Sequence, residues 1–162
     1  MLIAAAAVYG GGSYTALKRE QLNELDALCH TLRLMQDELE TRALPLPELA
    51  AQLDTSTENA GKALLSGLLR RLPELGSRDF QNIWEECVTE SVKHSEEAAR
   101  LLCTLGSFLG RYDVDSQLEA IRSCRETLEK LRTTAAEALP QTRRLGMGLA
   151  LTSGALIVIT LI

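Results

Sequence analysis

Charge is confined to the middle of this 162-residue chain, and this distribution constrains the fold more than any other feature of the sequence. Every Lys, Arg, Asp and Glu lies between Lys18 and Arg144, which leaves residues 1–17 and 145–162 uncharged. As an α-helix rising about 1.5 Å per residue, residues 145–162 reach about 27 Å, close to the hydrocarbon thickness of a bilayer. We therefore predict a C-terminal transmembrane helix over residues 145–162 and a more weakly apolar N-terminal one over residues 1–17.

Two basic pairs flank the charged middle region and predict its orientation. Lys18 and Arg19 follow the first uncharged segment, and Arg143 and Arg144 precede the last one. Positive residues close to the ends of membrane spans are retained on the cytoplasmic side. A cleaved signal peptide fits poorly, because no basic residue precedes the first apolar run. The pairs predict a membrane hairpin whose residues 18–144 hang in the cytoplasm.

Small residues recur at every fourth position in the last segment, at Gly146, Ala150 and Gly154. This spacing lets two helix backbones approach closely in lipid. One interpretation is that the span packs against the first span or against another membrane subunit. The other is that Ala and Gly are common in this segment without such a role.

Residues 18–144 have the pattern of consecutive amphipathic helices. A first stripe of apolar residues between Leu22 and Leu39 steps by three and four positions, as on one face of a helix. Further stripes follow, separated by Pro- and Gly-containing breaks, and no stretch alternates convincingly like a strand. We predict an all-α fold, a membrane-tethered bundle of about five to six soluble helices, with the first and last of them antiparallel.

Capping residues predict where these helices begin and end. Thr55 and Glu58 have the spacing of a capping box. A break near Ser95 precedes a helix that we expect to bury Phe108 and to have Gly110 as its C-terminal cap. Further starts are expected at Pro47, at Ser77 or Asp79, and near Ser116.

Composition excludes several classes of function. The net charge of −5 belongs to the middle region, which disfavours nucleic acid or an anionic lipid surface as the main partner. The four cysteines, Cys29, Cys87, Cys103 and Cys124, form no C-x-x-C pair, so we expect free thiols that pack as small apolar side chains.

Catalytic and cofactor motifs are not recognisable in the sequence. Gly61-Lys62 lacks the remaining residues of a P-loop. His30 and His94, the only histidines, have no metal-ligand spacing, and a Cys–His nucleophile pair would need tertiary contacts that the sequence does not indicate. We expect no cofactor, no metal and no enzymatic activity.

One segment carries a more specific pattern. It reads Leu105-Gly106, then Leu109-Gly110-x-x-Asp113-x-x-x-Gln117, with Trp84 upstream. A long charged helix and a short terminal span follow. This arrangement resembles the stage III sporulation protein AB family of spore-forming Firmicutes; the similar organisation covers nearly the whole chain, and the motif matches are confined to Trp84 and residues 105–117.

The resemblance implies a non-catalytic mother-cell membrane component of the channel to the engulfed forespore. The family's soluble domain is similar to the cytoplasmic domain of the type II secretion F platform protein. In such machines that domain docks a cytoplasmic ATPase, which here would be stage III sporulation protein AA, among other channel membrane subunits. As contact surface we propose the turn with Arg111, Tyr112, Asp113, Asp115 and Gln117, although Asp113 and Asp115 acting only as helix caps is the alternative.

Two other hypotheses remain at this point. The chain can be a membrane-anchored coiled-coil scaffold or signalling hairpin, unrelated to sporulation, whose stripe between Leu22 and Leu39 pairs between protomers. An enzyme using Cys and His requires His30 or His94 within hydrogen-bond reach of a cysteine. The sequence leaves the oligomeric state open.

Overall fold

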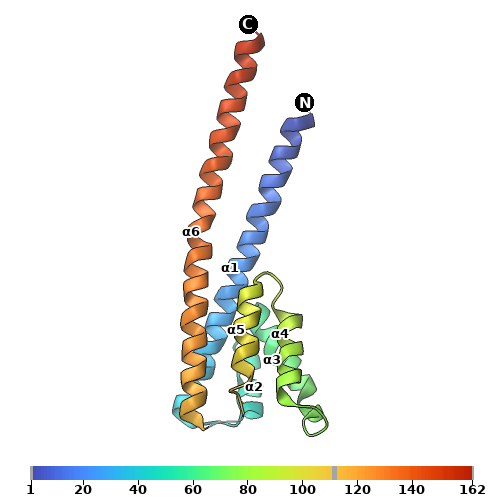
Figure 1. Ribbon diagram of the computed structural model, residues 1–162, viewed down its shortest axis with the longest axis vertical. Helices are drawn as coiled ribbons and strands as arrows, with labels where there is room; N and C mark the ends of the chain where they lie inside the picture. Colours follow the sequence, from blue (N-terminus) through green and yellow to red (C-terminus); the bar gives the residue numbers. More distant parts are fainter. Residues whose placement is uncertain (1, 111–112, 162) are drawn as a thin grey trace.

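The computed structural model describes residues 2–110 and 113–161, and the side chains of residues 15–110 and 113–138. Within these ranges the chain is helical and contains no β-strand (Figure 1). The α-helices are α1 (Leu2–Arg42), α2 (Leu46–Asp54), α3 (Asn59–Arg71), α4 (Phe80–Ser91), α5 (Glu96–Gly106) and α6 (Val114–Leu161), with a short 3-10 helix η1 (Leu72–Glu74). The predicted all-α fold and its number of helices are confirmed.

The long helices α1 and α6 lie antiparallel and side by side, and both chain ends lie at the same end of the molecule (Figure 1). The apolar stripe of α1 is buried. α6 adds Ile121, Cys124 and Leu128 to the same core. The stripe on α1 consists of Leu25, Leu28, Leu32, Met35 and Leu39. Because other helices of the same chain cover this stripe, it is not free to pair with a second protomer. The coiled-coil hypothesis depends on that pairing and is therefore weakened.

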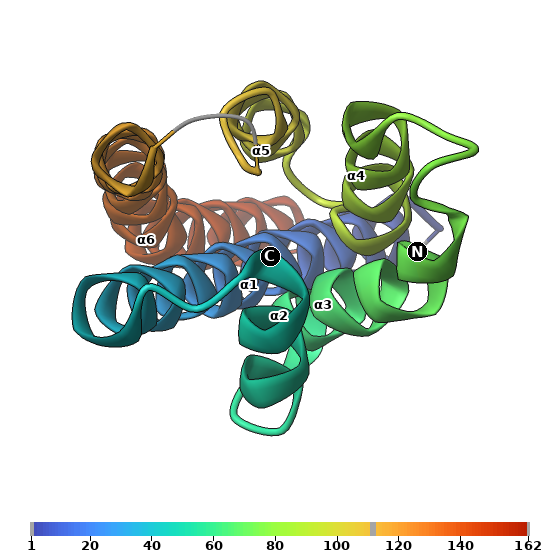
Figure 2. The same cartoon turned by 90° about the horizontal axis from the view of Figure 1, so that it is seen from below.

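The shorter helices pack around the long pair in sequence order: α3 on α1, α4 on α3 and α5 on α4 (Figure 2). α3 approaches α1 closely at Gly61, where a Cβ atom would overlap the hydroxyl of Thr31. That hydroxyl donates a hydrogen bond to the Ala27 carbonyl at 2.8 Å. A side chain at position 61 would therefore push the two helices apart.

Trp84 fixes the position of α5 against α4. Its indole is fully buried, and Nε1 donates a hydrogen bond to the carbonyl oxygen of Leu102 at 2.6 Å. Gly106, one turn further along α5, leaves room for the ring: a Cβ there would lie 2.8 Å from the Trp84 Cγ. Two residues that carry the family resemblance thus form one packing contact.

The helix caps agree only partly with the sequence prediction. The predicted break near Ser95 is confirmed, and the structure adds that the Ser95 hydroxyl caps α5 by accepting a hydrogen bond from the Ala98 amide at 3.3 Å. The predicted capping box is wrong: α3 begins at Asn59 without a side-chain cap, and the Thr55 hydroxyl donates to the Gln52 carbonyl. Thr55 instead satisfies a free carbonyl at the end of α2.

The end of α5 also differs from the prediction. The helix ends at Gly106, four residues before Gly110, and a turn follows in which the amides of Phe108 and Leu109 both donate to the Leu105 carbonyl. This turn rotates Phe108 out of the core. Phe108 is 40% exposed, whereas Leu109 is buried. The prediction that Phe108 lies in the core is wrong.

The four cysteines are free, as predicted. Cys29, Cys87 and Cys124 are buried and Cys103 is half-buried. Each lies on a helix and packs with the apolar core. They act here as small core side chains.

Membrane insertion stays a prediction. In the part of the chain that the structure describes, none of the helices has a stretch long and apolar enough to cross a bilayer. The predicted spans, residues 1–17 and 145–162, fall almost entirely on residues whose side chains lie outside the described ones. The backbones of α1 and α6 run as continuous helices into both segments.

Candidate partner-docking site

The turn between α5 and α6 is built by capping interactions. Asp113 precedes α6 and accepts hydrogen bonds from the Ser116 amide at 2.9 Å and the Ser116 hydroxyl at 3.0 Å. These bonds, the one from the backbone amide first, hold the pKa of Asp113 below its usual range. The Gln117 amide also donates to the Asp113 carbonyl at 3.1 Å. α6 therefore begins at Val114, slightly earlier than the expected start near Ser116.

Gly110 and Gln117 close the other side of the turn. The Gly110 backbone has a φ of 75°, in the left-handed region that favours glycine. Its amide donates to the side-chain oxygen of Gln117 at 3.3 Å. Of the candidate contact residues, Asp113 and Gln117 thus have a structural role, whereas Arg111 and Tyr112 lie outside the described residues.

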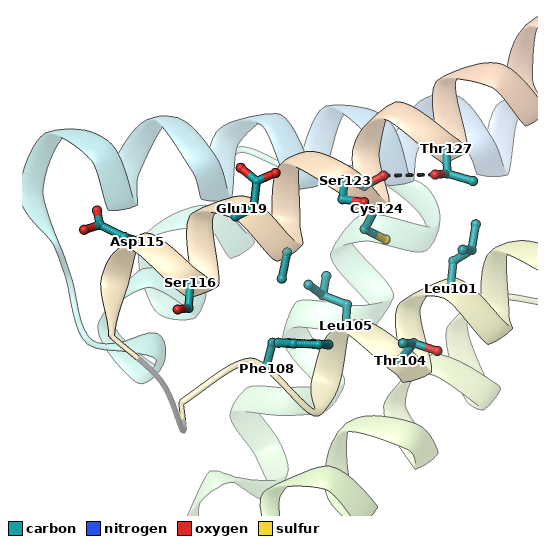
Figure 3. Close-up of a pocket in the computed structure, with 11 residues that line it drawn as sticks. Leu101, Thr104, Leu105, Phe108, Asp115, Ser116, Glu119, Ser123, Cys124 and Thr127 are labelled. Atoms are coloured by element: carbon teal, nitrogen blue, oxygen red, sulfur yellow. Dashed lines mark hydrogen bonds between the residues drawn. The ribbon is translucent and has the colours of Figure 1, made fainter.

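Asp115, like Asp113, is a candidate contact residue that the structure leaves exposed. It is exposed in the first turn of α6, where the helix dipole favours a negative charge. The residue lies at one end of a groove between α5 and α6, and its carboxylate points away from α5 (Figure 3). The structure therefore brings one of the predicted residues to a surface hollow that the sequence reading did not identify.

The groove has a volume of about 660 Å³ and is lined by one face of each helix. α5 and the turn after it contribute Leu101, Thr104, Leu105 and Phe108 (Figure 3). On both helices the lining residues recur at intervals of three and four positions, as expected for one helix face. Those of α6 are Asp115, Ser116, Glu119, Ala120, Ser123, Cys124 and Thr127. A groove of this form can bind an elongated apolar ligand, such as a peptide segment.

Sequence reasoning missed this groove because its residues look like ordinary helix faces. Phe108 gave the one available signal, a large apolar residue just before the Gly110 turn. Helical spacing predicts a core position for Phe108, but that spacing is broken where α5 ends at Gly106.

A second apolar hollow of about 490 Å³ lies at the same end of the bundle. It is lined from the α1–α2 connection, the α3–α4 connection and the start of α6, and includes Leu75 and Val114. Leu75, Phe108 and Val114 are three of the four exposed large apolar residues in the described part of the chain. Apolar surface is thus concentrated at the end of the bundle away from both termini.

The two histidines line hollows that no cysteine lines. His30 lines a small hollow with Asp26 and Glu58, and His94 lines another, where its Nε2 is 3.8 Å from a carboxylate oxygen of Glu20. Neither hollow is lined by a cysteine. The structure gives no support to the Cys–His enzyme hypothesis.

The cysteines also lack the electrostatics of nucleophiles. Burial raises the pKa of Cys29 to about 11 and that of Cys124 to about 12. Burial likewise raises the pKa values of Cys87 and Cys103. A reactive cysteine needs a lowered pKa, since the thiolate is the nucleophile. Among the described residues, no cluster of three or more His, Cys, Asp and Glu side chains could hold a metal ion.

The predicted topology residues are only partly described. Lys18 is half-buried and donates to the side-chain oxygen of Gln21 at 3.1 Å, and Arg19 is exposed. The remaining residues proposed for topology and for packing in the membrane lie outside the described side chains, so these assignments stay predictions. They are Arg143, Arg144, Gly146, Ala150 and Gly154.

Comparison with known proteins gives two matches. Over residues 1–162 the chain matches the family described as stage III sporulation protein AB. A solved structure of stage III sporulation protein AB (SpoIIIAB) has a similar fold, with a TM-score of 0.65 and 21% sequence identity; the match covers 75% of this chain and 97% of that one. No curated protein sequence matches the chain.

Proposed function

This chain belongs to the stage III sporulation protein AB family, and on that basis we propose that it is a non-catalytic platform of the channel between mother cell and forespore. In this proposal the helical domain docks a cytoplasmic ATPase, stage III sporulation protein AA, and acts beside other membrane subunits of the channel. The chain hydrolyses nothing itself. It anchors the ATPase and transmits its motion.

The observation that carries the docking proposal is the position of the exposed apolar surface. The hollow beside Leu75 is lined by the chain connections and the start of α6 that lie at the end of the bundle opposite the chain termini (Figure 1), and the groove between α5 and α6 extends from the start of α6 along the side of the bundle. Monomeric soluble domains rarely leave such patches uncovered, and they commonly mark interaction sites. A partner in the cytoplasm would approach a membrane-anchored bundle from this end.

The proposed membrane topology is supported by the arrangement of the two long helices. α1 and α6 leave the bundle in the same direction, as two legs of a hairpin do (Figure 1). With residues 1–17 and 145–162 in the bilayer, the basic pairs at Lys18 and Arg144 would lie at the cytoplasmic surface. The expected location is the mother-cell membrane around the forespore, with the bundle in the cytoplasm.

A coiled-coil scaffold or signalling hairpin is the weaker candidate. Its pairing face would be the stripe from Leu25 to Leu39, and these residues are buried within one chain. No other described feature favours that function.

Binding of the purified ATPase tests the proposal. The full chain in detergent is mixed with stage III sporulation protein AA, and complex formation is measured by size exclusion with light scattering at several salt concentrations. We expect a complex with the wild-type chain. Gly106→Ala forces α4 and α5 apart. This variant should form less complex if the ATPase binds the correctly packed bundle. A wild-type chain that binds no ATPase at any salt concentration would contradict the docking role.

A further inference from the structure

We propose that the groove between α5 and α6 is the docking site for an amphipathic helix of a partner protein, one with an apolar stripe flanked by Lys or Arg. The proposal rests on the docking role argued above and adds the site and the chemistry of the partner. Three observations support it: the shape of the groove, the charge at its rim, and the lack of a suitable apolar helix face elsewhere in the described part of the chain.

The shape fits a helix. The groove extends along α6 from Asp115 to Thr127, which corresponds to about 18 Å at the rise of an α-helix. α5 runs antiparallel to α6, with Leu101 facing the Thr127 end and Phe108 the Ser116 end (Figure 3). A third helix of about three turns can lie between two such ridges, with its apolar residues at positions i, i+3, i+4 and i+7 directed into the groove.

The floor of the groove is apolar. Leu105 and Cys124 are buried at its base, and Leu101 and Ala120 are half-buried beside them. Phe108 is 40% exposed at one end, so a bound helix would cover it. Covering apolar surface of this kind contributes about 25 cal/mol per Å² before the costs of association.

The rim of the groove is acidic. Its lining residues include Asp115 and Glu119 and no Lys or Arg, and the two carboxylates point outward from α6, away from α5 (Figure 3). The Glu119 side chain is 73% exposed, and Arg122, which lies 3.4 Å from it, also contacts Glu40 of α1 at 3.5 Å. Cations on the flank of an incoming helix would therefore meet Asp115 and compete with Arg122 for Glu119, which increases the association rate and selects against acidic helices.

The occupant must come from another protein. A second copy of this chain offers no matching helix in its described part. The exposed large apolar residues there are Leu17 on α1, Val114 on α6, and Leu75 and Phe108 in two separate connections, so no helix carries a stripe of them. The chain's own ends leave from the far end of the bundle (Figure 1). The remaining occupant is a helix from a different protein.

A designed peptide tests this without the ATPase, so a failure here is separate from a failure of ATPase docking. The probe is a fluorescent 15-residue helical peptide with Leu at positions i, i+3, i+4 and i+7 and Lys on its flanks, a length of about four turns. One comparison peptide has the same composition in scrambled order, and another carries Glu in place of Lys. The full chain is held in nanodiscs of zwitterionic lipid, with empty nanodiscs as the blank, and binding is measured by anisotropy.

We expect the Lys-flanked peptide to bind at least about tenfold more tightly than either comparison peptide. Ser123→Trp, which fills the groove from an exposed position, should weaken binding at least about tenfold. Thr133→Trp, on the same helix outside the groove, should change it less than about twofold. Thermal melting checks that both variants stay folded.

The charge at the rim has its own pair of variants. Glu119→Gln should reduce the preference for the Lys-flanked over the Glu-flanked peptide, whereas Glu126→Gln, an exposed carboxylate of α6 outside the groove, should leave it unchanged. The proposal is overturned if striped and scrambled peptides bind alike, or if Ser123→Trp has no more effect than Thr133→Trp.

Discussion

Glu24 on α1 holds the connection between α4 and α5 through the backbone of His94. Its carboxylate accepts hydrogen bonds from the His94 amide at 3.1 Å and from the Lys93 amide at 2.8 Å. Glu24 is buried, with 6% of its surface exposed. A buried carboxylate is costly unless it is hydrogen-bonded, and here the two amides that precede α5 supply the bonds. α1 therefore positions the helix that forms one wall of the groove.

Glu24→Ala should lower the free energy of unfolding by about 2–4 kcal/mol, because two amides lose a charged acceptor. The measurement is urea unfolding of a fragment of residues 18–144, which contains every described core residue. Glu20→Gln is the matched control, since Glu20 is exposed and its carboxylate lies 3.8 Å from Nε2 of His94, beyond hydrogen-bond distance. Its effect should stay within about 0.5 kcal/mol. Equal effects of the two substitutions would mean that the buried bonds contribute little.

Gly106→Ala should destabilise the fragment by about 3 kcal/mol, since the new methyl group overlaps the buried ring of Trp84. Gly67→Ala provides the comparison. A Cβ at position 67 would meet its nearest neighbour, the Cys87 sulfur, at an ordinary 3.6 Å, and Ala suits a helix better than Gly. That variant should be neutral or slightly stabilising in the same unfolding measurement, and a loss similar to that of Gly106→Ala would argue against the steric explanation.

Asp113→Ala should lower the melting temperature at pH 7 by a few degrees, and the difference should disappear in acid. Hydrogen bonds from Ser116 hold the pKa of Asp113 below its usual range, so the stabilisation is complete above the unfolded pKa of about 3.9. It is lost as the pH falls through the lower folded pKa. Thermal melts of wild type and variant from pH 7 to pH 2.5 measure this. A gap in melting temperature that is constant over this range would show that the charged cap is not the cause.

The thiols should react unequally with a disulfide reagent at pH 8. Cys103 is half-buried and should react first, although burial raises its pKa. Cys29 and Cys124, with pKa values raised to about 11 and about 12, should react at least about tenfold more slowly until the protein unfolds. Ellman's reagent with and without urea, followed by peptide mapping, assigns the thiols. Fast reaction of Cys29 in the folded chain would contradict its burial.

The sequence predicted the helices well where apolar spacing was long and regular. The stripe from Leu25 to Leu39 is buried as a single face, because a long helix repeats its spacing many times. Short-range signals were less reliable. Thr55 and Glu58 have the spacing of a capping box, yet the Thr55 hydroxyl is used by the preceding helix. The same residue types can serve a helix end or a helix start, and only the tertiary structure decides between them.

The groove proposed for docking could be predicted only in part. The motif that gave the family resemblance lies beside it, but Trp84, Gly106 and Asp113 of that motif stabilise the fold. The groove arises because α5 ends at Gly106 and the turn rotates Phe108 outward. Its α6 wall is formed by residues between Asp115 and Thr127. Such a surface depends on how two helices are placed, which spacing along one helix does not specify.

The continuity of α1 and α6 has a mechanical consequence for the proposed platform. α6 runs without interruption from the wall of the groove to Leu161, about 72 Å at the helical rise, and α1 lies against it. A partner that pulls on the groove at Asp115 would act at one end of a stiff lever, with the core around Leu128 as its support. In the proposed platform, torque applied at the groove would tilt the other end of the same helix, so the bundle would transmit motion as well as anchor the partner.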